Sequence, residues 1–546
     1  MAQNPPPGTR TPGYIPTVVA GCFAVFLAQV AYSLPGALNG TFQQEFATTG
    51  SQLTWITAAF AIPMVVLELT TGVIGDLFGR KRLLQAGAVL TVIGSLVSAL
   101  AETVQMMWIG MIVAGIGAAI LYPISLALIA AVAPGEQGRA KAIALWAGFL
   151  SIGAAVSPLL GGAFAENGSW RGAYAVVIGA AVVSFLITFK ATDSSAPEGR
   201  KLDIPGQITL AVGLVALLYA ATQGSETGFS DPEIIAATVA GVVLLAAFVV
   251  IELRTEVPLL NLRLFANRAY AIVAIATVVG MFAFLAICYS MSIWLGAIQH
   301  QSALKIGVLF LFIQGPALLL VPVVSHLIHN VSPRWVLSSG FALMAVTGVW
   351  CSTFDVADMS WTRFIAPMTI MGVGFALTVG SITAVAINTV PLRLAGMASA
   401  TTNLLRDLGF ALGPVLIAAL AIGKANDTML DGLGEAIGAS GLQPPHSEIA
   451  GGIAHEGGAM AINSMPVVPG PGPDAAPVPM PQQLHELAFS ALGGAYSTAF
   501  LVAGICAAAA AVLTMVGLFS HRPTAAGAGA GAVEPDGDAS PDLVGA

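Results

Sequence analysis

The chain has 546 residues, of which 56% are hydrophobic and only 9% are charged, and its mean hydropathy is +0.86. This composition excludes an ordinary soluble domain and indicates a helical protein that crosses a membrane many times. The net charge of −8 says little about partners, because most acidic residues lie in loops and tails. All four cysteines lie in apolar runs, which favours core positions over a disulfide framework or a metal site. They are Cys22, Cys288, Cys351 and Cys506.

Fourteen apolar runs are long enough to cross a bilayer as helices. In chain order they are Tyr14–Leu38, Leu53–Gly75, Leu83–Ala101, Met106–Val132, Ala140–Ala165, Gly172–Phe189, Ile204–Thr222, Ile234–Ile251, Tyr270–Leu295, Ile306–Ile328, Val336–Phe354, Phe364–Val390, Ala398–Ile422 and Ala491–Phe519.

The cations are distributed asymmetrically between the two sides that these spans define. With the amino terminus inside, only Arg171, Lys305, Arg363 and Lys424 fall outside, and the other sixteen of the twenty Lys and Arg residues fall inside. Positive charge near the ends of spans stays in the cytoplasm. The sequence therefore predicts a multi-pass protein of the cytoplasmic (inner) membrane with both termini in the cytoplasm.

An internal repeat relates the fourth and fifth runs to the twelfth and thirteenth. The motif Gly153-x-x-x-Ser157-Pro158 reappears 256 residues later as Gly409-x-x-x-Gly413-Pro414. Three further landmarks recur at an offset of 257, namely Gly115 with Gly372, Gly117 with Gly374, and Pro134 with Pro391. A shift of eight helices predicts two six-helix halves, 14–190 and 269–520, separated by two inserted helices within 191–253.

Four segments fall outside the helical halves. Residues 1–13 form a cytoplasmic tail, and 254–268 mixes apolar residues with arginines, as a segment lying along the cytoplasmic surface does. Residues 423–488 are rich in Gly, Pro and Ala and are expected to be an outer loop that is disordered or partly helical. The low-complexity segment 521–546 is expected to be a disordered cytoplasmic tail.

A short basic turn joins the second and third runs. Gly72 and Gly79 leave room for close approach of another helix. Asp76 lies at the carboxyl end of its helix, where the helix dipole disfavours an anion, so it is expected to serve a contact elsewhere. Arg80 and Lys81 follow directly. In an arbitrary protein such a turn only sets topology.

The spacing G-x-x-x-D-x-x-G-R-K-R of this turn resembles the signature between the second and third helices of the major facilitator superfamily. In that family the loop is a cytoplasmic latch whose contacts form and break as two halves rock. The resemblance implies an all-α polytopic membrane protein with the major facilitator fold, two six-helix halves plus two inserted helices, and a substrate cavity between the halves.

The fifth run carries a second resemblance, to the helix motif associated with exporters of this superfamily. It comprises Gly153, Pro158, Gly161 and Gly162, with Ser157 where glycine is usual. The resemblance implies a bend that packs against the opposite half near the outer gate and favours export over import. From the residues alone, a prolyl packing kink is an equally good interpretation.

The thirteenth run resembles the corresponding region of the fourteen-helix drug:proton antiporter group. The second-half equivalents are Arg406, Gly409 and Pro414. Because Arg406 and Asp407 are adjacent, they are expected to point to different faces of one helix and to pair poorly. Their position near the cytoplasmic end predicts gate or interface charges and not a buried relay.

The chain also departs from that group. The usual acids of the first and second helices are replaced by Ala31 and Ala58, and the Arg and Gln of the fourth helix by Met111 and Ala114. Proton coupling through the residues that are usual in that group therefore has no support in this sequence.

Glu68 is the remaining candidate for proton coupling. It lies eight residues before Asp76, about 12 Å along the helix, so it is inside the bilayer. An intramembrane carboxyl group is costly and is a functional hypothesis by default. A structural acid that is protonated or hydrogen bonded between helices is the equally weighted alternative.

The predicted cavity offers neutral polar and aromatic groups, which suit apolar or amphipathic molecules. The candidates are Gln29, Tyr32, Ser33, Asn39, Tyr289, Trp294 and Gln314. For any single one of them, a hydrogen bond between helices is the commoner role.

Together these features predict a secondary transporter that exports hydrophobic or amphipathic small molecules, as in drug or antibiotic efflux, driven by a proton gradient. One alternative is an uncoupled translocator of lipids or lipophilic metabolites, and another is a transporter-like receptor or assembly partner. No phosphate loop, metal cluster or nucleophile constellation is present in the sequence, so we expect no enzyme activity, cofactor or metal. The expected partners are the substrate and membrane lipids, without nucleic acid, and a monomer is expected to function.

Overall fold

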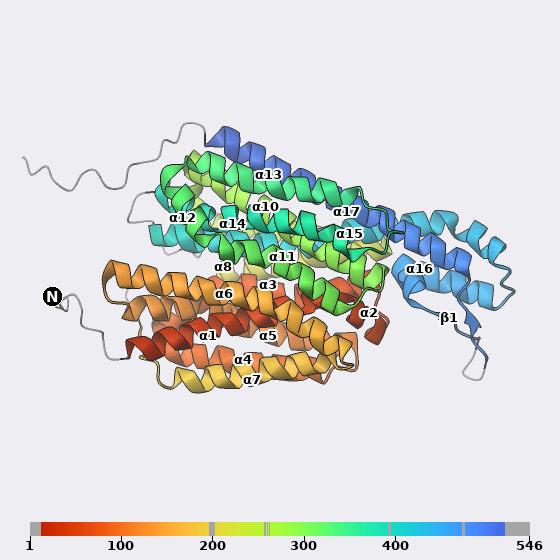
Figure 1. Ribbon diagram of the computed structural model, residues 1–546, viewed down its shortest axis with the longest axis horizontal. Coiled ribbons are helices and arrows are strands. Elements are labelled where there is room, and N and C mark those ends of the chain that lie inside the picture. The colour runs from red at the N-terminus through yellow and green to blue at the C-terminus, as the bar shows by residue number, and fades with distance from the viewer. Residues whose placement is uncertain are drawn as a thin grey trace, which may run out of the picture.

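The computed structural model describes residues 13–195, 202–255, 258, 260, 262–390, 395–471 and 475–518. Its long helices lie side by side along the molecule in two groups, with the amino-terminal half on one side and the carboxyl-terminal half on the other (Figure 1). The described part contains 13 helices long and apolar enough to cross a membrane, and a fourteenth span if the bent pair α11–α12 is one crossing. That pair bends by 44°. The predicted all-helical membrane fold is confirmed.

The helices follow the predicted order closely. The amino-terminal half contains α1 (Tyr14–Ser33), η1 (Leu34–Ala37), α2 (Asn39–Phe46), α3 (Gly50–Phe78), α4 (Arg80–Ala99), α5 (Val104–Val132), α6 (Gly135–Glu166) and α7 (Trp170–Thr188). The inserted pair is α8 (Ile204–Thr227) and α9 (Pro232–Arg254). The carboxyl-terminal half contains η2 (Leu262–Ala266), α10 (Arg268–Ser292), η3 (Ile293–Ile298), α11 (Ala303–Leu319), α12 (Val321–Asn330), α13 (Pro333–Ser352), η4 (Trp361–Phe364), α14 (Ile365–Asn388), α15 (Ala395–Ser440), α16 (His446–Ser464), β1 (Val467–Val468), β2 (Val478–Pro479) and α17 (Gln482–Gly517).

The repeated glycines of the fourth and twelfth spans make matching contacts. A Cβ atom added to Gly117 of α5 would lie 2.9 Å from the Gly87 carbonyl oxygen of α4. A Cβ atom added to Gly374 of α14 would lie 2.6 Å from the Gly340 carbonyl oxygen of α13. Small residues let membrane helices approach closely enough for backbone contact. The same device therefore packs equivalent helices in both halves.

The fifth and thirteenth spans show the same correspondence. In α6, a Cβ atom on Gly153 would lie 2.9 Å from the Phe26 carbonyl oxygen of α1. In α15, a Cβ atom on Gly409 would lie 2.6 Å from the Val278 carbonyl oxygen of α10. The repeat read from the sequence thus recurs as a repeat of helix-to-helix contacts. Pro391 and the tail beyond residue 518 lie outside the described residues.

The two halves touch at one end of the molecule, which we call the cap end. A Cβ atom on Gly40 of α2 would lie 2.3 Å from the Gly296 carbonyl oxygen of η3, and Asn39 Nδ2 donates to Ser292 Oγ at 2.9 Å. The opposite end carries the α3–α4 turn and is called the latch end. The start of α1 and the end of α17 lie there as well (Figure 1).

The inserted helix α8 is bonded to the amino-terminal half. Its Gln207 side chain donates to the Val66 carbonyl oxygen and accepts from the Thr70 hydroxyl of α3. At the cap end, the Glu226 carboxylate accepts the Ser51 backbone N–H at 3.0 Å, which satisfies a donor at the start of α3. Toward α15, by contrast, α8 presents an apolar cluster that contains Val415.

The segment 423–488 is a folded, mostly helical cap, so its described residues follow the partly helical alternative and not the disordered one. α15 continues for 46 residues as far as Ser440, and α16 and an antiparallel β1–β2 pair follow before α17 begins (Figure 1). The cap buries small residues such as Ala454 and Ala459 beside Leu433 and Leu484. Alanine-rich helices pack closely without large side chains, which is why composition alone suggested disorder.

Histidine 300 connects the cap to both halves. It follows η3 with a positive φ of 52°. Its Nδ1 atom lies 3.3 Å from Gln44 Nε2 of α2, and its Nε2 atom lies 3.3 Å from the Asn463 carbonyl oxygen of α16. Asn463 Nδ2 in turn donates to the Ala297 carbonyl oxygen at 3.1 Å.

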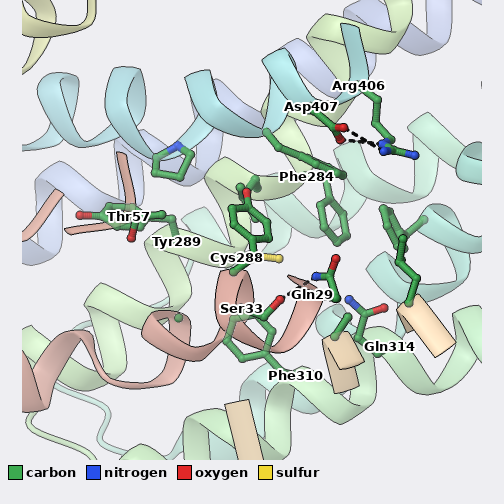
Figure 2. A pocket seen from close by; sticks show the side chains of 18 of the residues that line it. Gln29, Ser33, Thr57, Phe284, Cys288, Tyr289, Phe310, Gln314, Arg406 and Asp407 are labelled. Carbon is green, nitrogen blue, oxygen red and sulfur yellow. Dashed lines mark hydrogen bonds and ion pairs between the residues drawn. The ribbon is translucent and has the colours of Figure 1, made fainter. Parts of the chain in front are cut away.

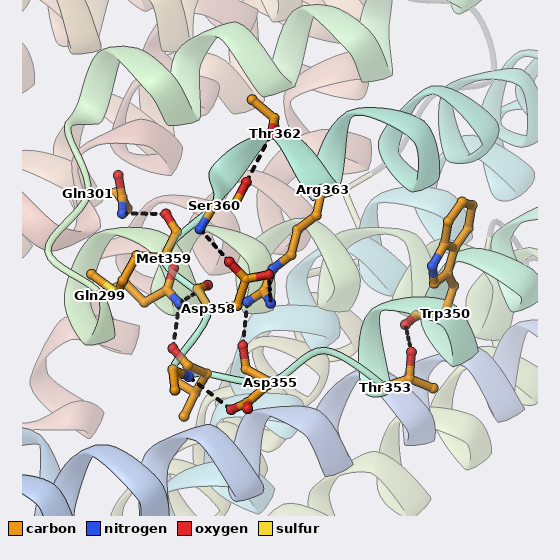
Figure 3. Close-up of polar contacts among 12 residues, drawn as sticks. Gln299, Gln301, Trp350, Thr353, Asp355, Asp358, Met359, Ser360, Thr362 and Arg363 are labelled. Carbon is orange, nitrogen blue, oxygen red and sulfur yellow. Dashed lines mark hydrogen bonds and ion pairs between the residues drawn. The ribbon is translucent and has the colours of Figure 1, made fainter.

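The loop between α13 and η4 is held rigidly at the same end (Figure 3). Gln299 Nε2 donates to the carbonyl oxygens of Val356 and Asp358 at 2.7 and 3.0 Å. Arg363 pairs with the Asp358 carboxylate at 3.1 Å and donates to the Asp355 carbonyl oxygen at 2.7 Å. These bonds order the loop between α13 and η4 beside the cap.

Glycine packing predicts a matched pair of stability effects. A Cβ atom on Gly94 of α4 would lie 2.4 Å from the Ala114 backbone nitrogen of α5, whereas Gly179 of α7 has nothing within 4 Å. Gly94→Val is expected to cost about 1–3 kcal/mol through overpacking. The measurement is the thermal midpoint of the purified protein in detergent. Equal midpoints for Gly94→Val and Gly179→Val would contradict this packing.

The histidine contact predicts a pH dependence. Desolvation against the cap lowers the pKa of His300 below its ordinary value of 6.5, opposed by its hydrogen bond to Asn463, and His485 lowers it slightly further. Because the pKa of His300 is lowered in the folded state, the neutral ring is the favoured form there. Its contribution to the stability of the fold is fully present above pH 6.5 and is lost as the pH falls to the lowered pKa. Protection factors in the cap, which are exchange rates corrected for their intrinsic pH dependence, should therefore fall on acidification. His300→Gln should flatten this response, and the exposed control His455→Gln should keep it.

Candidate functional site

A cavity of about 160 Å³ lies between the two halves near the middle of the molecule (Figure 2). Helices α1, α3, α5 and α6 line it from one half and α10, α11, α14 and α15 from the other. Six residues predicted from the sequence belong to its lining, namely Gln29, Tyr32, Ser33, Asn39, Tyr289 and Gln314.

Aromatic rings form much of the remaining wall. Phe284 of α10 and Phe375 of α14 stack with their centroids 4.1 Å apart, and Phe410 of α15 lies 5.9 Å from Phe284. Phe310 of α11 completes the aromatic surface (Figure 2). Such a wall binds flat or branched apolar groups without demanding one shape.

Trp294, the seventh predicted residue, lies elsewhere. Its side chain is fully buried in η3, with its ring centroid 6.0 Å from that of Phe500 and the Arg363 guanidinium 5.9 Å away. Trp294 belongs to the packing beneath the loop between α13 and η4 and not to the cavity. The sequence could not separate the two, because α10 and η3 are buried on nearly every face.

Polar side chains of the cavity form a chain between α5 and α1. Tyr122 Oη donates to Gln29 Oε1 at 2.7 Å, and Gln29 Nε2 donates to Ser33 Oγ at 2.7 Å. At the other side of the cavity, Tyr289 Oη and Thr54 Oγ1 lie 2.9 Å apart. These bonds hold the polar groups at fixed places in an otherwise apolar wall.

Arg406 and Asp407 form a two-bond ion pair at the edge of the cavity, so the expectation that they pair poorly is wrong (Figure 2). Arg406 Nε donates to Asp407 Oδ1 at 2.8 Å, and a second guanidinium nitrogen donates to Oδ2 at 3.0 Å. The Asp407 side chain is only 8% exposed. The long arginine side chain bends back on its own helix, which backbone geometry alone does not reveal. Arg406 is 23% exposed and lines both cavities, so the pair lies at the interface between the halves.

Glu68 of α3 faces this pair from the opposite half. Its carboxyl group lies close enough to Asp407 and Arg406 to interact with both electrostatically. The side chain is half-buried, and its Oε2 atom is buried without a hydrogen-bond partner among the described residues. Glu68 therefore belongs to a charge cluster that the two halves build together.

A second cavity, of about 590 Å³, opens on the latch side of this cluster. Glu68 and Asp76 line it, together with Arg406 and Tyr122, which also line the central cavity. Arg406 and Tyr122 thus stand at the boundary between the two spaces.

The latch turn is bonded to the amino-terminal half and to the segment that follows α7. Arg80 pairs with Asp76 at 2.8 Å and donates to the Ala127 carbonyl oxygen of α5 at 3.3 Å. The Lys81 backbone N–H donates to the Asp193 carboxylate at 3.0 Å. Gly79 adopts a φ of 104°, where glycine is favoured, and Asp193 lies against its Cα. Asp193 was not predicted, because nothing in the linear sequence brings it to the turn.

The α6 motif for which a bend was predicted lies where the halves meet toward the cap end. A Cβ atom on Gly162 would lie 2.6 Å from the Ala303 carbonyl oxygen of α11, and one on Gly307 of α11 would lie 2.6 Å from the Pro158 carbonyl oxygen. Gly161 packs against Leu34. Pro414, the second-half equivalent, lines the central cavity, and Gly72 of the latch has nothing within 4 Å of an added Cβ atom.

The positions at which the family carries charges are apolar and buried here. Ala31, Ala58 and Met111 are 5%, 2% and 1% exposed. Ala58 packs in the apolar cluster shared by α3, α8 and α15, and Met111 Sδ accepts from the Tyr174 hydroxyl at 3.8 Å. The charge cluster around Arg406 is therefore the one intramembrane cluster of opposite charges that we find between the halves in the described part of the chain.

Comparisons with known proteins agree with this architecture. Residues 21–414 match the model of the Major Facilitator Superfamily. The multidrug resistance protein Stp of Mycobacterium tuberculosis (strain CDC 1551 / Oshkosh) is 29% identical over 397 residues, which cover 72% of each chain. The drug efflux pump JefA of the same strain is 27% identical over 410 residues, covering 74% of this chain and 79% of JefA.

Solved structures share the fold at low sequence identity. A bacterial homologue of the human lysosomal transporter Spinster, solved in an inward-facing and unoccupied conformation, superposes with a TM-score of 0.61 at 14% identity, covering 93% of this chain and 99% of its own. A structure described for substrate recognition in proton dependent oligopeptide transporters has a TM-score of 0.57 at 16% identity, covering 92% and 98%.

The ion pair predicts a strong stability effect. Arg406→Met leaves the Asp407 carboxylate buried without its partner, which is expected to cost about 3–5 kcal/mol. Adding Asp407→Asn removes that charge and should recover most of the loss. The exposed pair of Arg171 and Glu45, 40% and 37% exposed, provides the control, because Arg171→Met should cost only about 0–1 kcal/mol. Thermal midpoints in detergent report all three, and a double variant no more stable than Arg406→Met would contradict the pairing.

Proposed function

Because the chain belongs to the Major Facilitator Superfamily, we propose that it exports hydrophobic or amphipathic small molecules by alternating access, coupled to protons. One observation carries the proposal: a mainly aromatic cavity between the two halves meets a buried charge cluster that both halves contribute. The cavity receives the substrate, and the cluster binds the proton.

The cavity wall supports the substrate class. Its stacked phenylalanines supply apolar surface, and the Tyr122–Gln29–Ser33 chain supplies a few oriented hydrogen-bonding groups. A substrate with an apolar body and one or two polar groups suits this lining better than a sugar or an inorganic anion does. The relatives named for multidrug resistance and drug efflux are consistent with this class.

The distribution of contacts supports alternating access. The halves are joined toward the cap end through Gly40 with Gly296 and through Gly162 with α11, whereas the 590 Å³ cavity separates them toward the latch end. Rocking about the charge cluster would open the cap end and close the latch end. In that motion the latch residues Asp76, Arg80 and Lys81 would exchange their present partners for contacts with the other half.

Topology places the latch end in the cytoplasm in this proposal, because the clustered cations of the α3–α4 turn belong inside. The protein is then an inner-membrane exporter with both termini in the cytoplasm. One chain supplies both walls of the cavity, so a monomer suffices for transport.

A second candidate is an uncoupled translocator of lipids or lipophilic metabolites. The apolar residues Ala31, Ala58 and Met111 favour it, since the usual charged positions for coupling are absent. The two candidates differ in whether a pH gradient drives the substrate.

Transport in proteoliposomes distinguishes them. With ethidium as the probe, we expect an imposed pH gradient to drive uptake into vesicles that contain the wild-type chain. Glu68→Gln should abolish this gradient-driven part, because an amide cannot carry the proton. Glu102→Gln, at an exposed position between α4 and α5, is the control and should transport as wild type does. Wild-type flux that is the same with and without the pH gradient would favour the uncoupled translocator. An absence of flux would favour a transporter-like receptor.

A further inference from the structure

Two carboxyl groups, and not one, occupy the charge cluster. Asp407 was not a predicted coupling residue, yet it is buried in α15 and faces Glu68 of α3. Arg406 supplies one positive charge to the pair. Two neighbouring carboxylates beside a single guanidinium favour a state in which the two groups share one proton.

The hydrogen bonds assign that proton to one of the two groups. Both Asp407 oxygens accept guanidinium N–H donors, at 2.8 and 3.0 Å, as an ionised carboxylate does. An ionised carboxylate has no proton to donate, so a single proton in this conformation resides on Glu68, and Asp407 carries the negative charge.

The two carboxyl groups also face different spaces. Asp407 lines the central cavity but not the latch-end cavity, whereas Glu68 lines the latch-end cavity but not the central one. Arg406 and Tyr122 line both. The remaining ionisable groups near the cluster are the phenols of Tyr122 on α5 and Tyr32 on α1, and the latter is close to Cys288 on α10.

We propose that Asp407 is the cavity-facing half of a shared proton site, which passes its proton to Glu68 for release at the latch end. In the transfer, the O–H bond on Asp407 breaks and an O–H bond forms on Glu68. The negative charge thereby moves from Glu68 to Asp407, where the Arg406 guanidinium neutralises it. A substrate in the central cavity thus meets Asp407, and the proton leaves by the other side. The inference rests on the proposed proton-coupled export.

The pair makes a prediction that a single carrier at Glu68 does not. Asp407→Asn should abolish gradient-driven ethidium uptake as completely as Glu68→Gln does, and the double variant should be no worse than either, because both groups serve one proton. Ethidium counterflow without a gradient reports separately whether each single variant still binds and exchanges the substrate. Asp427→Asn, an exposed acid on the same helix, is the matched control and should leave both activities unchanged.

Infrared spectroscopy of the purified chain provides a readout that does not need transport. At neutral pH the wild type should show the carbonyl band of a buried protonated carboxyl group. Glu68→Gln should remove this band, and Asp407→Asn should shift it, because the neighbouring negative charge is lost. If Asp407→Asn also loses counterflow, the infrared band decides whether Asp407 and Glu68 share one proton.

The outcomes separate the inference from the proposed function. Absence of gradient-driven uptake in the wild type would overturn proton-coupled export itself. Full gradient-driven uptake by Asp407→Asn, with coupling intact in the wild type, would overturn only the shared site. An infrared band that is unchanged in Asp407→Asn would also overturn it.

Discussion

The ion pair of Arg406 with Asp407 lies between the two halves, where the central cavity and the latch-end cavity meet. A charge inside a bilayer is tolerated when the protein neutralises it and satisfies its hydrogen bonds. The pair does this through two short bonds within one helix, and Glu68 approaches from the other half. Since α3 and α15 belong to different halves, the cluster forms only when those halves are in register. Any relative movement of the halves therefore changes the electrostatic state of the cluster.

Glycine packing provides the rigid bodies that such a movement needs. Within each half, helices approach until a single added Cβ atom would meet backbone, as at Gly117 and Gly374. Between the halves this close packing is concentrated toward the cap end, at Gly40 and Gly162. Packing of this kind is sensitive to one methyl group and does not deform gradually. The two halves are thus expected to move as units, with change confined to their interface.

How far each feature of the fold and the site could be predicted from the sequence depends on the physical interaction that determines it. The spans were predictable because the bilayer imposes their length and polarity, and Glu68 was conspicuous as a lone carboxyl group in an apolar run. Asp407 was misjudged because the bend of the Arg406 side chain is a tertiary feature. The cap was left open between disorder and partial helix because its Ala- and Gly-rich helices resemble a disordered segment by composition. Trp294 was assigned to the cavity because a helix buried on all sides has no periodicity that separates its faces.

The contacts of the inserted helix α8 indicate with which half it moves. Its polar bonds go to α3, through Gln207 and Glu226, while its contacts in the apolar cluster with α15 include no hydrogen bond that we find in the described residues. Hydrogen bonds in a membrane fix a partner and a register, whereas apolar surfaces slide over one another at little cost. In the proposed rocking motion, this asymmetry would make α8 move with the amino-terminal half and keep the interface between α3 and α15 covered. Glu68 and Asp407 would then stay shielded from lipid while each remains exposed to its own cavity, which is the condition that a proton site shared across a moving interface requires.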